Sequence, residues 1–214
     1  MPDIEDARSW YRADDPVHGI DHILRVRALA LYLAKNSKAD ARIVEAAALL
    51  HDASGGDAME GERSTHHERS AVFARQILER EDWEEQDINR VVECIAAHRF
   101  RGGDSAQSLE AQILYDADKL DVIGAFGAAR TIAYAVEADQ PVYADVSEDF
   151  IKTGKTKAGE PHSAYHEYLF KLRNVRKTLF TQAAKELAED REKILVALFE
   201  GLANEATFGA DKTK

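Results

Sequence analysis

The stretch 46–52 (AAALLHD) constrains the fold most strongly, because it is typical of the end of a buried helix that carries two metal-capable side chains. At helical spacing Ile43, Leu50 and His51 share one face, so the imidazole of His51 continues an apolar stripe toward the interior. A Ser-Gly-Gly stop signal follows at 54–56. A His-Asp pair alone is expected roughly once by chance in such a chain. The pair therefore indicates a metal site only together with the sequence around it.

The composition favours helices throughout. Alanine, leucine and glutamate abound, whereas there are only 4 prolines among 214 residues. The hydrophobic content of 45% and charged content of 31% are typical of a globular protein. We therefore expect helices rather than sheets, and either one domain or a domain with extensions.

The net charge of −11 limits the partners of the chain. A nucleic-acid polymer is not expected to bind, because its phosphate backbone would be repelled. A small anionic ligand would bind only where a cation compensates its charge, which is indirect support for a bound metal.

The single cysteine and the absence of a long apolar run exclude several kinds of site and a membrane-spanning protein. The one cysteine, Cys94, excludes an internal disulfide and a cysteine-based zinc cluster, and we expect it to be a buried thiol. No apolar run approaches the roughly 18 residues of a membrane span. The acidic N-terminus has no signal-peptide core, so we expect a cytoplasmic protein without a membrane partner.

Hydrophobic periodicity and breaker residues predict the order of the helices. The segment 138–162 lacks helical periodicity and contains Pro141, Gly154, Gly159 and Pro161, so we expect a mobile lid or a disordered loop there. Residues 208–214 are expected to be a frayed tail. The predicted helices cover residues 4–12, 19–36, 41–52 (capped by Asp40), 66–80, 87–98, 109–135 as two helices or one bent helix, and 163–204.

Four residues of ligand type lie on the inward faces of three of these helices: His22, His51 with Asp52, and Asp118. Each residue taken singly is more often a hydrogen-bonded core residue. Two imidazoles and two carboxylates together suit a six-coordinate divalent ion such as Mn²⁺, Mg²⁺ or Fe²⁺. A structural zinc site would instead be a closed set, usually with cysteine.

A further carboxylate on the helix of Asp118 supports a buried cation. Leu114, Asp118 and Asp121 fall on one helical face that is otherwise apolar. Burying ionised carboxylates without a partner is expensive, so this face requires a cation, a metal or solvent.

The local strings around these residues resemble the HD-domain family of metal-dependent phosphohydrolases. The stretch 18–26 (HGIDHILRV) is similar to the first motif of the family, and 47–52 (AALLHD) is similar to the second. The stretch 114–121 (LYDADKLD), followed by 123–130 (IGAFGAAR), resembles a subgroup of small stand-alone bacterial HD hydrolases. The resemblance covers about residues 15–200.

The resemblance implies an all-α, single-domain helical bundle over residues 1–214, with its core at about 15–200, and a set of metal ligands. The ligands would be His22, His51, Asp52 and Asp118, holding Mn²⁺, Mg²⁺, Fe²⁺ or Co²⁺, with one ion favoured over two. The function implied is hydrolysis of a phosphoester or phosphoanhydride by attack of a metal-activated water, with a nucleotide as the expected substrate. A homodimer is a further expectation.

Neighbouring residues are candidates for substrate contacts. Arg25 lies one turn from His22 and Lys119 lies beside Asp118, so we expect both to contact phosphate, although ordinary salt-bridged roles are as common for such residues. Asp121 is expected to orient a ligand. The expected catalytic residues are His51, Asp52, Arg25, Lys119 and Asp121, and the expected substrate-binding residues are Arg25, His66, His67, His98 and Lys119.

Two other functions stay open on the sequence. His67 or His66, together with His98, could instead hold a second metal, as in cyclic-nucleotide or dinucleotide phosphodiesterases. A catalytically silent module that binds a nucleotide is the third possibility. The number of metal ions per chain and the turnover of phosphate esters separate the three.

Overall fold

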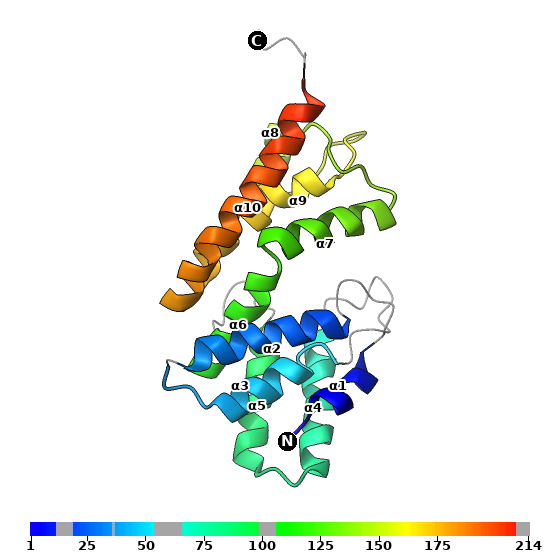
Figure 1. The fold of residues 1–214 in the computed structure, drawn as a ribbon. Coiled ribbons are helices and arrows are strands. Elements are labelled where there is room, and N and C mark those ends of the chain that lie inside the picture. Colours follow the sequence, from blue (N-terminus) through cyan, green and yellow to red (C-terminus); the bar gives the residue numbers. More distant parts are fainter. Residues whose placement is uncertain (12–18, 36, 54–65, 99–105, 209–214) are drawn as a thin grey trace. The chain divides into compact units, whose positions relative to one another are not determined.

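A computed structural model describes residues 1–11, 19–35, 37–53, 66–98 and 106–208, and all structural statements refer to these ranges. Helices are the regular elements of this part of the chain, in which no strand occurs, so the all-α prediction is confirmed (Figure 1). None of the described helices combines the length and apolar character needed to cross a membrane. The elements are α1 (Ile4–Trp10), α2 (Ile20–Lys35), α3 (Ala41–Leu50), α4 (His66–Arg80), α5 (Glu85–Ala97), α6 (Leu109–Asp121), α7 (Gly124–Glu137), α8 (Glu148–Thr153), α9 (Ala164–Phe170), the 3-10 helix η1 (Leu172–Thr178) and α10 (Gln182–Ala206).

The helices fall into two compact units. Unit 1 contains residues 1–121 together with 179–184, and unit 2 contains 122–178 and 185–214. The residues expected to bind metal all belong to unit 1, so the site is described within that unit.

Unit 1 is built around α3, which packs against α2, α4, α5 and α6. Its apolar residues from Ile43 to Leu50 are all buried, as an alanine- and leucine-rich helix at the centre of a bundle requires. The side chain of Asp40 caps the helix by accepting a hydrogen bond from the backbone N–H of Arg42 at 3.0 Å, as predicted. The C-terminal end of α3 therefore lies inside the unit.

The C-terminal stretch differs from the single long helical stretch expected over 163–204. It is divided into α9, η1 and α10. The carboxylate of Asp116, which is fully buried, accepts hydrogen bonds from the backbone N–H groups of Phe180 and Thr181 at 2.8 and 2.7 Å, and from the Thr181 hydroxyl at 2.7 Å. These contacts hold residues 180–181 outside a helix, just before α10 begins.

The segment 138–162 contains a short helix, α8, that periodicity did not predict. Polar contacts organise this part of unit 2. The Glu160 carboxylate accepts hydrogen bonds from the backbone N–H of Lys157 and from the backbone N–H and hydroxyl of Ser147, each at 2.8 Å. These bonds, together with one from His166, lower the pKa of Glu160 to about 2. The expectation of a mobile lid stays a prediction.

Candidate metal centre

The end of α3 orients His51. Carbonyl groups in the last turn of a helix have no partner within the helix, so other groups must satisfy them. Nδ1 of His51 lies 2.9 Å from the carbonyl oxygen of Ala48, and the Tyr11 hydroxyl donates to the carbonyl oxygen of Leu49 at 2.7 Å. A carbonyl oxygen only accepts, so Nδ1 of His51 carries the ring proton and Nε2 presents its lone pair.

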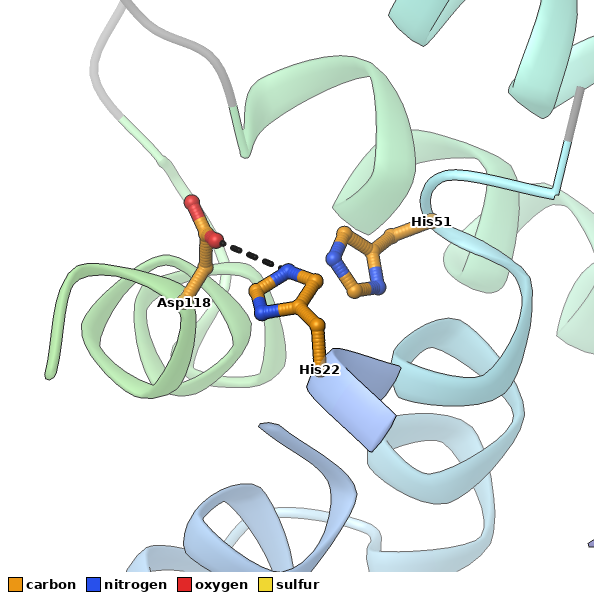
Figure 2. Close-up of side chains that lie close together, drawn as sticks. All are labelled: His22, His51 and Asp118. Carbon is orange, nitrogen blue, oxygen red and sulfur yellow. Dashed lines mark ion pairs between the residues drawn. The ribbon is translucent and has the colours of Figure 1, made fainter. Parts of the chain in front are cut away.

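Helices α2 and α6 and the turn after α3 bring the remaining ligand-type residues to His51. His22 near the start of α2 places its Nε2 3.6 Å from Oδ1 of Asp118 on α6 and 4.0 Å from Oδ2 of Asp52. Nε2 of His51 lies 3.7 Å from the same Oδ2 of Asp52. Figure 2 shows the rings of His22 and His51 beside the carboxylate of Asp118.

The spacing of these atoms fits one divalent ion. One ligand atom each from His22, His51 and Asp118 lies within 4.8 Å of the others. Ligands about 2.1 Å from a common octahedral ion are roughly 3 to 4 Å apart. The three ligand atoms would therefore need to move only slightly closer together to coordinate one ion. Asp52 lies at comparable distances from both imidazoles and can supply a fourth ligand.

The electrostatics of the cluster also favour a cation. Burial lowers the pKa of His51 to about 4, so the ring is neutral at neutral pH. Its buried Nε2 makes no hydrogen bond within the described part of the chain. A lone pair that faces the carboxylate of Asp52 without a proton or cation between them is unfavourable. A metal ion is the group that this donor set fits.

Lys119 adjoins one of the carboxylates. Its Nζ lies 2.7 Å from Oδ2 of Asp118 and 5.0 Å from the ring centre of Tyr115. Burial raises the pKa of Asp118, but Lys119 and the nearby imidazoles outweigh it and hold this pKa well below its usual range. Asp118 is therefore an ionised carboxylate, and the Lys119 side chain that contacts it is 22% exposed.

Asp121 contacts the Nδ1 atom of His22, whereas Asp118 faces the Nε2 atom of the same ring. Its Oδ2 is 2.7 Å from Nδ1 of His22, and its carboxylate also accepts two hydrogen bonds from Arg25. Burial raises the pKa of Asp121, but the hydrogen bonds from His22 and Arg25 outweigh it and lower the pKa well below its usual range. Nδ1 of His22 thus donates to Asp121, and Nε2 faces Asp118 and Asp52.

His98 follows the last residue of α5 and is buried in the same cluster. Its Nδ1 lies 2.5 Å from the carbonyl oxygen of Ile95, and its Nε2 lies 3.5 Å from Oδ1 of Asp52. The His98 ring centre is 5.2 Å from that of His51. His98 therefore lies near Oδ1 of Asp52, whereas His22 and His51 lie near Oδ2.

The two other histidines expected at the site begin α4. The side chain of His66 lies outside the described part of the chain. His67 is half-buried in the first turn of the helix. Their proposed substrate contacts stay predictions.

Tyr11 is a residue of this region that the sequence did not assign to the site. The sequence places Tyr11 only within the helix predicted over 4–12, whereas the structure places its hydroxyl at the end of α3. Burial, followed by the charge of Asp52, raises the pKa of Tyr11 well above its ordinary value. The hydroxyl is therefore a permanent donor, and no periodic pattern in the sequence signals this contact.

Comparison with known proteins matches the region of the cluster to a family. The model of the HD domain family matches residues 19–123. The uncharacterized protein YpgQ of Bacillus subtilis is 30% identical over 200 residues, which are 90% of this chain and 88% of YpgQ.

Solved structures are similar over almost the whole chain. The crystal structure of Bacillus subtilis YpgQ in complex with ADP has a TM-score of 0.73 and 29% identity, and the match covers 98% of this chain and 100% of that one. An HD-superfamily hydrolase from Bacillus thuringiensis has a TM-score of 0.67 and 25% identity, with 96% and 97% of the two chains covered.

Proposed function

The chain belongs to the HD-domain family, and we propose that it is a divalent-metal-dependent hydrolase of phosphoester or phosphoanhydride bonds. The observation that carries this proposal is the convergence of His22, His51 and Asp118 with Asp52 around one position in unit 1. The structural similarity to an HD-superfamily hydrolase supports the reaction class.

We propose a nucleotide as the substrate. The complex of Bacillus subtilis YpgQ with ADP supports this choice, because YpgQ is similar to this chain over nearly its full length. The net charge of −11 also means that a polyanionic substrate needs local cations, and the proposed site offers a metal position and Lys119.

Each ligand residue has a defined task in this proposal. A bound divalent ion (Mn²⁺, Mg²⁺, Fe²⁺ or Co²⁺) would polarise a phosphoryl oxygen and lower the pKa of a water molecule. His22 and His51 offer their Nε2 atoms, while Asp52 and Asp118 offer carboxylate oxygens. Lys119 keeps its ammonium group 2.7 Å from Asp118, where it can also meet a phosphate oxygen of the substrate.

A two-metal phosphodiesterase is the second candidate, because one contact favours it. Nε2 of His98 is 3.5 Å from Oδ1 of Asp52, whereas His22 and His51 approach Oδ2. A carboxylate with imidazoles at both oxygens can bridge two ions. Two metal ions per chain, with one lost in His98→Ala, would favour this function over the one-metal hydrolase.

A metal-dependent hydrolysis screen tests the proposal. The protein is stripped with EDTA, reloaded with Mn²⁺, Mg²⁺ or Co²⁺, and incubated with nucleoside mono-, di- and triphosphates, while phosphate and pyrophosphate release are measured. We expect turnover that requires metal and is lost in His51→Ala. His162→Ala, which changes a histidine in unit 2, is the matched control and should keep its turnover.

Three outcomes would contradict the hydrolase. Turnover that persists without metal, or that is unchanged in His51→Ala, would remove the cluster from the chemistry. Binding of metal and ADP without turnover of any phosphate ester would instead indicate a silent nucleotide-binding module.

A further inference from the structure

Arg25 makes a specific two-pronged contact with Asp121. Its Nε lies 2.7 Å from Oδ1, and its Nη2 lies 3.0 Å from Oδ2. This side-on pairing uses the planar geometry of the guanidinium, which a lysine cannot reproduce. The Arg25 side chain is 26% exposed, whereas that of Asp121 is 1% exposed. The positive charge of Arg25 is therefore directed inward, at a buried carboxylate.

The same carboxylate holds the imidazole of His22. Oδ2 of Asp121 accepts from Nδ1 of His22 at 2.7 Å in addition to its contact with Arg25. With its Nδ1 engaged, His22 can turn only Nε2 toward Asp118 and Asp52. A histidine ligand fixed in this way has its orientation set before any metal binds.

The charge of Arg25 is needed because Asp121 is buried. A carboxylate removed from water is stable only when it is paired and hydrogen-bonded, and the guanidinium of Arg25 brings a full positive charge into direct contact with Asp121. Without that charge, Asp121 would be a less stable acceptor for His22. The contacts thus form a chain from the partly exposed guanidinium to the imidazole that faces the proposed metal.

We propose that Arg25 and Asp121 are positioning residues for His22 and set the affinity of the site for its metal ion, so that Arg25 is not a phosphate contact. This inference rests on the proposed function for the identity of the site as a metal centre. Contacts of this kind behind a metal-bound histidine typically change metal affinity about 10- to 100-fold. The same range is expected for loss of either residue.

Metal titration tests the proposal without reference to turnover. Protein freed of metal with EDTA is titrated with Co²⁺, and the Kd is measured by calorimetry and by visible absorption of the bound ion. The variants are Arg25→Gln, Arg25→Lys, Asp121→Asn and the double variant Arg25→Gln/Asp121→Asn. The control is Arg27→Gln, two positions along the same helix, because Arg27 pairs with Glu45 instead of with the cluster.

We expect Co²⁺ to bind about 10- to 100-fold more weakly to each single variant and with unchanged affinity to Arg27→Gln. The double variant should be little weaker than the worse single variant, because both residues act through His22. ¹⁵N chemical shifts of His22 in the metal-free protein should report a proton on Nδ1 in the wild type. Arg25→Lys retains the charge, so weaker Co²⁺ binding by this variant would assign the effect to the bidentate (two-pronged) contact of the guanidinium with Asp121.

A Co²⁺ affinity within twofold of wild type in Arg25→Gln and Asp121→Asn would overturn the proposal. So would a higher KM for nucleotide in Arg25→Gln with the Co²⁺ affinity unchanged, because that result assigns Arg25 to the phosphate. The proposed function fails separately: a wild type that binds Co²⁺ in an Arg25-dependent manner but hydrolyses no phosphate ester would keep the positioning role and remove the hydrolase. Circular dichroism of each metal-free variant identifies any loss of fold.

Discussion

The hydroxyl of Tyr11 donates a 2.7 Å hydrogen bond to the carbonyl oxygen of Leu49, two residues before His51. This contact joins the residue after α1 to the last turn of α3. The ring of Tyr11 also packs on the small core cluster of Ala7, Ile23 and Leu49. The N-terminal helix thereby supports the chain segment that carries His51 and Asp52.

Removal of this hydroxyl should destabilise the metal-free protein. In Tyr11→Phe the carbonyl of Leu49 loses its donor in a buried position, which should lower the free energy of unfolding by about 1 to 2 kcal/mol. Urea unfolding in EDTA measures the change. Tyr32→Phe is the control, because the side chain of Tyr32 is 56% exposed and the change should be close to zero. Equal stability of the two variants would show that the hydroxyl contributes nothing.

Divalent metal should stabilise the wild type but not His51→Ala. An ion that binds only the folded state raises the free energy of unfolding by about 2.7 kcal/mol when its concentration is 100 times its Kd. Thermal unfolding with EDTA and with increasing Mn²⁺ measures this gain, which requires the Nε2 atom of His51. His162→Ala should respond to Mn²⁺ as the wild type does. An equal Mn²⁺-induced gain in the stability of His51→Ala would show that the ion binds at a site without His51.

Cys94 should be unreactive in the folded protein at pH 8. Burial raises the pKa of its thiol from an ordinary value of 9.0 to about 12, so almost no thiolate forms. Because the folded pKa exceeds the unfolded one, the resulting stability is complete below pH 9 and is lost as the pH rises toward 12. We expect Ellman's reagent to react within seconds in urea and far more slowly without it. A rapid reaction in buffer would mean that the thiol is exposed.

The same residue allows a stability control at alkaline pH. Cys94→Ala cannot titrate, so its free energy of unfolding should fall less than that of the wild type between pH 9 and pH 11. Identical slopes in the two proteins would contradict the raised pKa.

Two Gly→Ala substitutions should change stability in opposite directions. A Cβ atom on Gly127 would lie 2.1 Å from the carbonyl oxygen of Val122, so the backbone would have to move, and we expect a loss of about 2 kcal/mol or more. A Cβ atom on Gly201 in α10 would meet no atom within 4 Å, and alanine should gain about 0.5 to 1 kcal/mol there. Thermal unfolding of both variants measures the difference, and a shift of the same sign in both would contradict it.

Helical periodicity determined most of the secondary structure of unit 1. Apolar stripes predict helices over 19–36 and 66–80, and the structure has α2 at Ile20–Lys35 and α4 at His66–Arg80. The sequence predicts Asp40 as a cap because its side chain can accept from a free N–H of the next helix, and the structure confirms this bond. Hydrophobic periodicity is a local property, so it can be detected from the sequence wherever one face of a helix is buried. The motifs likewise determined the family, to which the chain belongs.

Only the tertiary structure decided which polar groups are partners. Asp116 and Asp121 stand five residues apart in one motif, yet one accepts from the chain before α10 and the other from His22 and Arg25. The partners of Asp121 are more than 90 residues distant in sequence. Such hydrogen bonds follow no period, because they depend on how distant helices pack. The sequence therefore determined that His22, His51, Asp52 and Asp118 face inward, whereas the fold decided that they meet and that Arg25 is directed at Asp121.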